Sequence, residues 1–269
     1  MDILNHMDEE RYSELSDFLA FVGMYEDRER IRVYKELMDA HRDAIEGGVV
    51  VEAGAGFGVF SRYALRLGAE RVYLVERNLY MIEILRKRFK GQDRVRIVDR
   101  DILDFHPQED VDVLIHDFYG PLLYDESLYA LDNLKFEPKV VLPDGGRLVM
   151  DVVPYGELLD EVVDEDVMEL LKGVLVSDLF YYDSSKEFRH TVLEWKWQEG
   201  LVGDEFCLDF KDGHILVFAL ELFHNGEFLC RAGQCENWFL VFTPVAGKCF
   251  RFDFEWDGEF TRVYFDWTR

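Results

Sequence analysis

The two halves of the chain differ in the period at which apolar and polar positions alternate. Over residues 1–153, short apolar runs rich in valine alternate with segments whose apolar positions recur every three or four residues. The first kind of run predicts strands and the second predicts amphipathic helices. The predicted strands are 49–52, 72–76, 95–98, 111–116 and 147–153, and the predicted helices lie within 14–46, 59–67 and 80–89. Alternating strands and helices indicate βαβ units and a mostly parallel sheet.

From about residue 154 the apolar period becomes two. After an acidic helical piece at 157–171, the alternating runs are 191–197, 206–210, 215–223, 238–245, 250–256 and 261–267. Asp-Gly or Asn-Gly pairs at 212–213, 225–226 and 257–258 are typical of tight hairpins. This half is therefore predicted to be an aromatic-rich antiparallel β domain of barrel or sandwich type.

The pattern divides the chain into three parts. Residues 1–46 are N-terminal helices, and residues 47–153 form a Rossmann-like α/β domain with helices on both faces of its sheet. Residues 154–269 form a β-barrel-like domain for substrate binding or dimerisation. The length of 269 residues is sufficient for a sizeable core.

The charge of the chain limits its partners. A net charge of −25 repels phosphate backbones and attracts cations, so nucleic acid is an unlikely partner and a basic one is favoured. No run reaches the roughly 18 apolar residues of a membrane span. The acidic first residues are unlike a secretory or mitochondrial leader.

The four cysteines, Cys207, Cys230, Cys235 and Cys249, form no Cys-x-x-Cys pair. No pair of histidines lies near enough in sequence to complete a zinc pattern, so no metal site is predicted. We expect reduced, mostly buried thiols and hence a cytoplasmic protein.

A glycine-rich turn follows the first predicted strand. Gly54, Gly56 and Gly58 stand at alternate positions, and glycine lets the backbone turn sharply and approach a ligand. Glu52, at the end of that strand, suits a cationic sulfonium better than a pyrophosphate. Glu76 ends the next strand and can accept hydrogen bonds from ribose hydroxyls.

The spacing Glu-x-Gly-x-Gly-x-Gly resembles motif I of the class I S-adenosylmethionine (SAM) methyltransferases. The resemblance implies SAM as cofactor and S-adenosyl-L-homocysteine as product. It also implies that Glu76 binds the ribose, and that Asp101 with Ile102 stands where the adenine amino group is recognised. The N-terminal helices would cover this cofactor.

Two acids lie in the loop after strand 111–116. Asp117 and Glu126 are nine positions apart across a Gly-Pro turn, at the carboxyl end of a strand. If the loop folds back, both carboxylates face one cationic group; the alternative is a solvated acidic loop without a partner. His116 is either a general base or a structural residue. The segment 117–121 also faintly resembles the Asp-Pro-Pro-Tyr loop of methyltransferases acting on bases or glutamine.

The acidic loop more closely resembles the double-acid loop of the protein arginine methyltransferases. Gly120, Glu126 and Ser127 follow the family spacing, and Tyr124 stands one position before the family's tyrosine. The resemblance implies methyl transfer to an arginine guanidinium held by Asp117 and Glu126, with Tyr124 at the substrate pocket. Two carboxylates can bind a guanidinium bidentately.

Segment 24–34 resembles the helix that precedes motif I in that family. This match implies that Met24 packs on the cofactor, that Arg30 binds its methionine carboxylate and that Asp27 lines the substrate pocket. Residues 236–238 fall where the family carries Thr-His-Trp, which implies a substrate contact for Trp238.

The chain departs from the family pattern at three further positions. Asp117 replaces the first glutamate, His116 replaces the preceding serine, and Asn237 replaces the histidine of Thr-His-Trp. These changes leave open whether arginine is still the acceptor and whether the product is mono- or dimethylated.

The partners implied by resemblance and charge are a basic, Arg-rich protein or peptide and a second copy of the chain. The family dimerises through an arm, for which 157–171 is a candidate. Two alternatives remain open: a methyltransferase of a small molecule or nucleobase on the same scaffold, and a non-catalytic SAM-binding module.

Overall fold

The computed structural model describes residues 12, 18–19, 21–159, 163–236, 238–256, 258 and 261–268. Among them, no helix combines the length and the apolar character needed to cross a bilayer.

Five parallel strands form the first sheet. They are β1 (Val49–Ala53), β2 (Arg71–Glu76), β3 (Val95–Asp99), β4 (Val113–His116) and β5 (Val140–Leu142). Their order is β3-β2-β1-β4-β5, and all neighbours are parallel. The order reverses between β1 and β4, and in open α/β sheets such a reversal opens a crevice at the carboxyl ends of the strands. The glycine turn after β1 and the acidic loop after β4 therefore meet at one place.

Helices connect and cover this sheet. They are α2 (Arg28–Ala40), α3 (Arg42–Ile45), α4 (Val59–Leu67), α5 (Leu79–Arg88) and the short 3-10 turns η2 (Ile102–Asp104) and η3 (Leu128–Asn133). The predicted helix 59–67 is confirmed: it begins after Gly58, ends at Gly68, and buries Phe60, Ala64 and Leu67. Within the predicted 14–46, α2 and α3 are confirmed, whereas residues 14–17 and 20 lie outside the described residues.

Two antiparallel sheets form the second half. Their elements are β6 (Gly145–Pro154), η4 (Tyr155–Glu157), α6 (Glu165–Leu171), β7 (Val176–Ser177), β8 (His190–Lys196), β9 (Gly200–Val202), β10 (Phe206–Cys207), β11 (His214–His224), β12 (Glu227–Arg231), β13 (Val241–Pro244), β14 (Cys249–Trp256) and β15 (Thr261–Thr268). One sheet runs β7-β13-β11-β6-β8-β9 with β12 on β11, and the other runs β10-β14-β15. The sheets meet through aromatic rings: Phe218 of β11 lies 5.6 Å from Phe250 and 5.4 Å from Phe252 of β14.

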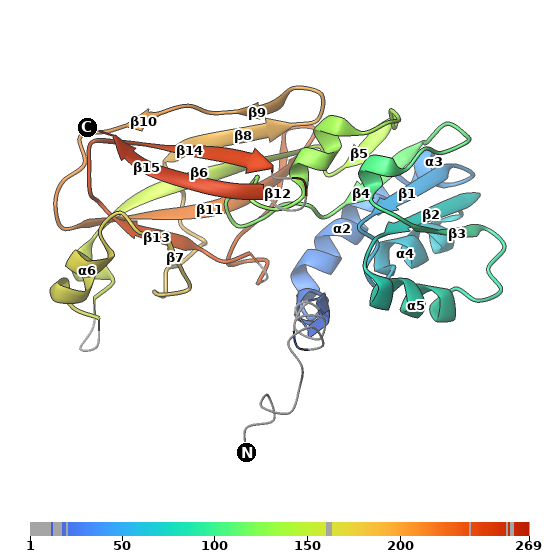
Figure 1. Cartoon of the computed structure of the whole chain (residues 1–269), viewed down its shortest axis with the longest axis horizontal. Helices are drawn as coiled ribbons and strands as arrows, with labels where there is room; N and C mark the ends of the chain where they lie inside the picture. The colour runs from blue at the N-terminus through green and yellow to red at the C-terminus, as the bar shows by residue number, and fades with distance from the viewer. Residues whose placement is uncertain are drawn as a thin grey trace, which may run out of the picture.

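Figure 1 shows the parallel sheet and its helices beside the antiparallel sheets, with α2 lying between the two. The predicted α/β domain with a following antiparallel β domain is confirmed. The candidate arm at 157–171 contains α6, on which Leu170 is 84% exposed; residues 160–162 lie outside the described part of the chain.

One strand belongs to a different sheet from the one expected. We assigned 147–153 to the parallel sheet, but β6 pairs antiparallel with β11 and β8. The short β5, which the pattern did not reveal, takes the edge position beside β4. A strand buried on both faces has the same apolar pattern in either sheet, so periodicity could not decide its neighbours.

The hairpin predictions have mixed outcomes. Asn225 and Gly226, with φ of 50° and 79°, form the tight turn between β11 and β12 and are confirmed. The pair 212–213 does not join two paired strands, because β10 pairs with β14. Residue 257 lies outside the described residues, although β14 and β15 do pair.

The expectation of four reduced cysteines is wrong. Cys207 of β10 and Cys249 of β14 form a disulfide, whereas Cys230 and Cys235 are free and buried. The two bonded residues lie directly opposite each other in the sheet but 42 positions apart in sequence, so their spacing gave no signal. The cytoplasmic location that we inferred from reduced thiols stays a prediction.

Candidate active site

A cavity of about 700 Å³ opens where the strand order reverses. Residues from α2, the glycine turn, the ends of β2 and β3 and the acidic loop line it together. The predicted site residues in its lining are Met24, Arg30, Glu52, Gly54, Gly56, Glu76, Asp101, Ile102, Asp117 and Glu126. The fold thus brings both predicted acids and all of the predicted cofactor residues except Gly58 to one cavity.

The glycine turn is closely packed by aromatic rings. Gly54 and Gly56 have φ of 64° and 49°, in the left-handed region that favours glycine. A Cβ on Gly54 would lie 2.7 Å from Phe118 Cε1, and one on Gly56 would lie 2.6 Å from the Tyr25 hydroxyl. Gly58 does not line the cavity; a Cβ there would collide with core side chains beneath the turn.

Glu76 fastens this turn to the end of β2. Its Oε2 accepts a hydrogen bond of 2.8 Å from the backbone N–H of Gly56. Its Oε1 accepts two more, also of 2.8 Å, from the N–H groups of Arg77 and Asn78. Three charge-assisted hydrogen bonds fix this buried carboxylate at the cavity wall.

Glu52 faces the cavity and also hydrogen-bonds the helix that follows the glycine turn. It lines the cavity, and its Oε2 also accepts a hydrogen bond of 2.8 Å from the N–H of Ser61 in the first turn of α4. Burial raises the pKa of Glu52 to about 7. A cation in the cavity would favour the charged form of this carboxylate.

Asp101 and Ile102 form the far wall. Asp101 is the N-cap of η2, and its Oδ1 accepts from the Leu103 N–H at 2.9 Å. Its Oδ2 lies 3.0 Å from Arg77 Nη1 in a partly exposed ion pair. Ile102 is buried and offers an apolar surface to the cavity.

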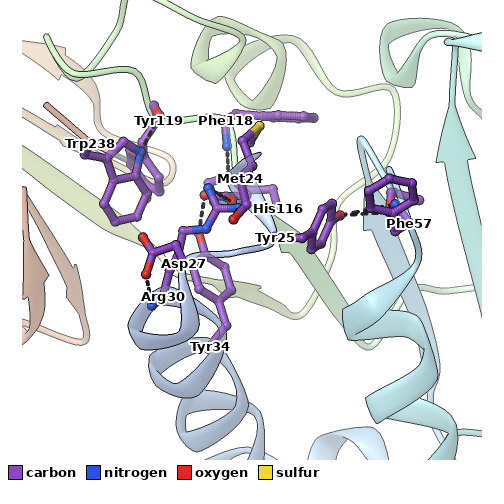
Figure 2. Close-up of polar contacts among 12 residues, drawn as sticks. Met24, Tyr25, Asp27, Arg30, Tyr34, Phe57, His116, Phe118, Tyr119 and Trp238 are labelled. Atoms are coloured by element: carbon purple, nitrogen blue, oxygen red, sulfur yellow. Dashed lines mark hydrogen bonds and ion pairs between the residues drawn. The ribbon is translucent and has the colours of Figure 1, made fainter. Parts of the chain in front are cut away.

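Asp117 is held by two groups of α2. Its Oδ2 lies 2.9 Å from Arg30 Nη1, and its Oδ1 accepts from the Tyr34 hydroxyl at 3.0 Å. Arg30 is only 2% exposed, and its Nη2 donates to the Met24 carbonyl at 2.9 Å (Figure 2). The helix before the glycine turn therefore positions the first acid of the loop.

Glu126 is the freer of the two acids. Its side chain reaches into the open cavity, yet the surrounding protein removes enough water to raise its pKa to about 8. Repulsion from Asp125 and Asp117 acts in the same direction, and attraction to Arg30 acts against it. Without a cation beside it, Glu126 is mostly protonated at neutral pH.

The antiparallel domain supports the acidic loop from outside. Thr261 Oγ1 donates to the Glu126 carbonyl at 2.7 Å, and Trp238 Nε1 donates to the Tyr119 carbonyl at 3.0 Å. Sequence reasoning missed Thr261 and Tyr119, as it missed Tyr34, because each acts through a contact with a distant segment. No local motif could have identified them.

His116 lines the cavity but has a structural environment. It is buried, and its Nε2 lies 2.9 Å from the Pro143 carbonyl, which can only accept, so Nε2 carries the proton. Nδ1 then accepts from the Phe118 N–H at 3.4 Å. Burial lowers the pKa of His116 to about 4. Both ring nitrogens are engaged, which favours the structural alternative over the general base.

Tyr124, which we expected at the substrate pocket, does not line the cavity. Its hydroxyl donates to Asp132 Oδ2 at 2.7 Å, and its ring lies 5.6 Å from that of Phe254 on β14. The preceding Leu123 has a φ of 73°, which closes a tight turn with Gly120. The turn and these contacts hold Tyr124 against the antiparallel domain.

Two further predicted substrate residues lie beside the cavity rather than in its wall. Asp27 is buried and caps α2, where its Oδ1 accepts from the Arg30 N–H at 2.9 Å. Trp238 is buried with its ring centre 5.9 Å from Arg30 Cζ (Figure 2). Asn237 lies outside the described residues.

Comparisons with known protein sequences match only part of the chain. The matching family model describes ribosomal RNA adenine dimethylase and covers residues 31–137. A probable protein arginine N-methyltransferase 6 from Arabidopsis thaliana is 30% identical over 54% of this chain and 36% of its own length. A probable protein arginine N-methyltransferase 6.1 from Oryza sativa subsp. indica is 32% identical over 57% of this chain and 43% of its own length. The match therefore spans less than half of these curated relatives.

Solved structures resemble nearly the whole chain. The Trypanosoma brucei PRMT1 enzyme–prozyme heterotetrameric complex with AdoHcy has a TM-score of 0.63 at 17% identity, over 91% of this chain and 92% of that one. Arabidopsis thaliana protein arginine methyltransferase 10 has a TM-score of 0.58 at 15% identity, over 90% and 96%. At these identities the likeness establishes the fold.

This chain has the fold of the class I methyltransferases. Within that class it resembles the protein arginine methyltransferase family, in sequence over about half of its length and in structure over both of its halves. The predicted resemblance is confirmed.

Proposed function

We propose that this protein is a SAM-dependent N-methyltransferase whose acceptor is the guanidinium group of a protein arginine. The observation that carries the proposal is that Asp117 and Glu126 share one cavity with the glycine turn and Glu76. The proposed site for a nucleoside thus adjoins the proposed site for a cation. Relatives named as arginine methyltransferases support the same reaction.

The residues at the cavity fit SAM. Glu76 is a fixed carboxylate suited to ribose hydroxyls, and Asp101 can accept from an adenine amino group. Among the described residues, Arg30 Nε is buried without a hydrogen-bond partner, so a donor remains for the carboxylate of the methionine part. Bound SAM would supply an electrophilic methyl group on a sulfonium, whose charge Glu52 offsets.

The acid pair would overcome the weak nucleophilicity of a guanidinium. Arginine keeps its charge in proteins, and its lone pairs are delocalised. Asp117, fixed by Arg30 and Tyr34, and the freer Glu126 would hold two sides of the group and turn one nitrogen towards the methyl donor. They would also stabilise positive charge away from that nitrogen. When the nitrogen loses its proton, the raised pKa of Glu126 suits it to accept that proton.

Activity is expected to rise with pH through about 8. Glu126 must be ionised to bind the guanidinium, and its pKa of about 8 leaves it mostly neutral at pH 7. Arginine does not titrate in this range, so the change belongs to the protein. At saturating SAM, kcat/KM for an arginine peptide should increase nearly tenfold per pH unit below 8 and level off above it. A profile that is flat or falls between pH 6.5 and 9 would contradict this role.

A nucleobase acceptor is the second candidate, and the match of residues 31–137 to the ribosomal RNA adenine dimethylase model favours it. That range includes the proposed cofactor residues from Glu52 to Ile102, which both reactions would use, but not Met24 or Arg30. The net charge of −25 disfavours RNA. We therefore propose a basic, Arg-rich protein segment as the partner. We also propose that the chain forms a homodimer and that it is located in the cytoplasm.

The class of acceptor can be tested by label transfer. The full chain is incubated with SAM labelled in its methyl group and with three acceptors: an arginine- and glycine-rich peptide, an RNA oligonucleotide and a metabolite extract. Label in the peptide alone supports the proposal. Label in RNA or in small molecules would replace it, and tight SAM binding without transfer to any pool would indicate a non-catalytic binding module.

A further inference from the structure

Three side chains that can bind a metal ion meet at the outer edge of the antiparallel domain. Glu205 precedes β10, Cys207 ends it, and Cys249 begins β14. One carboxylate oxygen of Glu205 and the two sulfur atoms all lie within 4.8 Å of one another, which holds for no other such group in the described part of the chain. β10 lies at the end of the domain that points away from the parallel sheet (Figure 1), and none of the three residues lines the proposed active site.

The two sulfur atoms form the Cys207–Cys249 disulfide in this structure. Cys207 is exposed and Cys249 is half-buried, so a thiolate in solution can reach the bond. Exposed disulfides are reduced more readily than buried ones, and the cytosol keeps thiols reduced. A dithiol reductant supplies two electrons and two protons to the disulfide and is itself oxidised to a disulfide. In the proposed cytoplasmic location the pair is therefore present as two thiols.

The contacts between β10 and β14 keep the two thiols together after reduction. The ring of Phe206 lies 5.6 Å from that of Phe250, its partner on β14. The Leu208 N–H donates to the Lys248 carbonyl at 3.2 Å. The Cα atoms of the two cysteines are 4.2 Å apart. Two thiolates on one tetrahedral zinc ion lie about 3.8 Å apart, since each Zn–S bond is about 2.3 Å long. Rotation of the two side chains is sufficient to reach that separation.

Glu205 adds an oxygen ligand beside the two sulfur atoms. Its Oε2 lies 3.8 Å from the Cys207 Sγ, and its Oε1 accepts a hydrogen bond from the Thr268 hydroxyl at the end of β15. A hydrogen bond of this kind orients a ligating carboxylate. Two thiolates and one carboxylate suit Zn²⁺ in tetrahedral geometry, whereas Mg²⁺ and Ca²⁺ prefer oxygen ligands alone.

We propose that the reduced protein binds one Zn²⁺ ion through Cys207, Cys249 and Glu205, with water as the fourth ligand. The two thiols release their protons when they bind the metal. The ion replaces the disulfide as the cross-link between β14 and the two-residue strand β10. The site is structural rather than catalytic, and it is independent of the proposed methyl transfer.

Metal binding by the full chain tests this site. The protein is first equilibrated in a glutathione buffer of cytosolic redox potential, and its thiols are counted after acid quenching and unfolding; all four cysteines should be reduced. The folded, reduced protein is then freed of glutathione without oxygen and titrated with Zn²⁺ against a chromophoric chelator. We expect one ion per reduced chain and none on the oxidised chain. Co²⁺ serves as an optical probe, because thiolate ligands give it a charge-transfer band.

Variants of the three ligands identify the site. Cys207→Ser, at an exposed position, should raise the Kd for Zn²⁺ about 100-fold, and Glu205→Gln should raise it about tenfold. Cys235→Ser removes a thiol from the other cysteine pair, and Glu199→Gln neutralises an exposed acid outside the cluster. These two matched controls should leave the Kd unchanged.

Several results would overturn the zinc site. They are a disulfide that persists in the glutathione buffer, a reduced chain that binds no Zn²⁺, and an oxidised chain that binds it equally well. A Kd that is unchanged in Cys207→Ser, or raised as much in Cys235→Ser, would do the same. Methyl transfer depends on other residues, so it is measured separately and each proposal can fail alone.

Discussion

Glu126→Gln is expected to lower methyl transfer by about three orders of magnitude and to leave the Kd for SAM within a few-fold. The substitution keeps the size of the side chain but removes the charge that would hold and polarise the acceptor, and losses of about 10²–10³ are typical when one such electrostatic contact is removed. The backbone contact from Thr261 to the Glu126 carbonyl is unaffected. Single-turnover rates and calorimetric SAM titration measure the two quantities.

A matched control separates charge at the site from charge in general. Glu137→Gln makes the same chemical change at an exposed position that does not line the cavity, and it should alter neither quantity. If Glu126→Gln abolished SAM binding, Glu126 would be a structural residue. If it left transfer intact, the acid-pair mechanism would be wrong.

Glu76→Ala is expected to raise the Kd for SAM about 100-fold. Hydrogen bonds to a charged group contribute about 1.5–3 kcal/mol each, and 1.4 kcal/mol corresponds to a factor of ten. The substitution would remove the proposed contact to ribose, and it would also release the N–H groups of Gly56, Arg77 and Asn78, so the glycine turn would lose its shape.

Asp101→Ala provides the comparison for Glu76. Asp101 is partly exposed and already paired with Arg77, so its loss should raise the Kd for SAM less than tenfold. Urea unfolding of both variants shows whether they remain folded. A folded Glu76→Ala protein with an unchanged Kd would exclude Glu76 from the cofactor site.

Local signals made the cofactor half predictable. The strand, glycine turn and helix from Val49 to Leu67 are contiguous in sequence, and their apolar periods and glycines specify them without distant contacts. The neighbours of β6 and the Cys207–Cys249 disulfide depend instead on pairing between remote segments. A single sequence carries little signal for such pairing.

The site also contains residues that local sequence predicts and residues that depend on contacts with distant segments. Several residues that line the cavity were predicted because they stand at fixed spacings next to strand ends, as Glu52 and Glu76 do. Tyr34 had no predicted role, yet it hydrogen-bonds Asp117 from 83 positions away. Thr261 supports Glu126 from 135 positions away. Tyr124 was misplaced because a turn at Leu123 directs it to the other domain.

Tandem mass spectrometry of a methylated peptide tests the central claim most directly, because it identifies the atom that receives the methyl group. The full chain is incubated with SAM and an arginine- and glycine-rich peptide, and in parallel with the same peptide in which each arginine is changed to lysine. We predict a one-methyl mass gain on the arginine peptide alone, with fragment ions that place it on the guanidinium. Methylation of the lysine peptide, or no product from either peptide while SAM binding is verified in the same sample, would contradict the claim that Asp117 and Glu126 hold an arginine for methyl transfer.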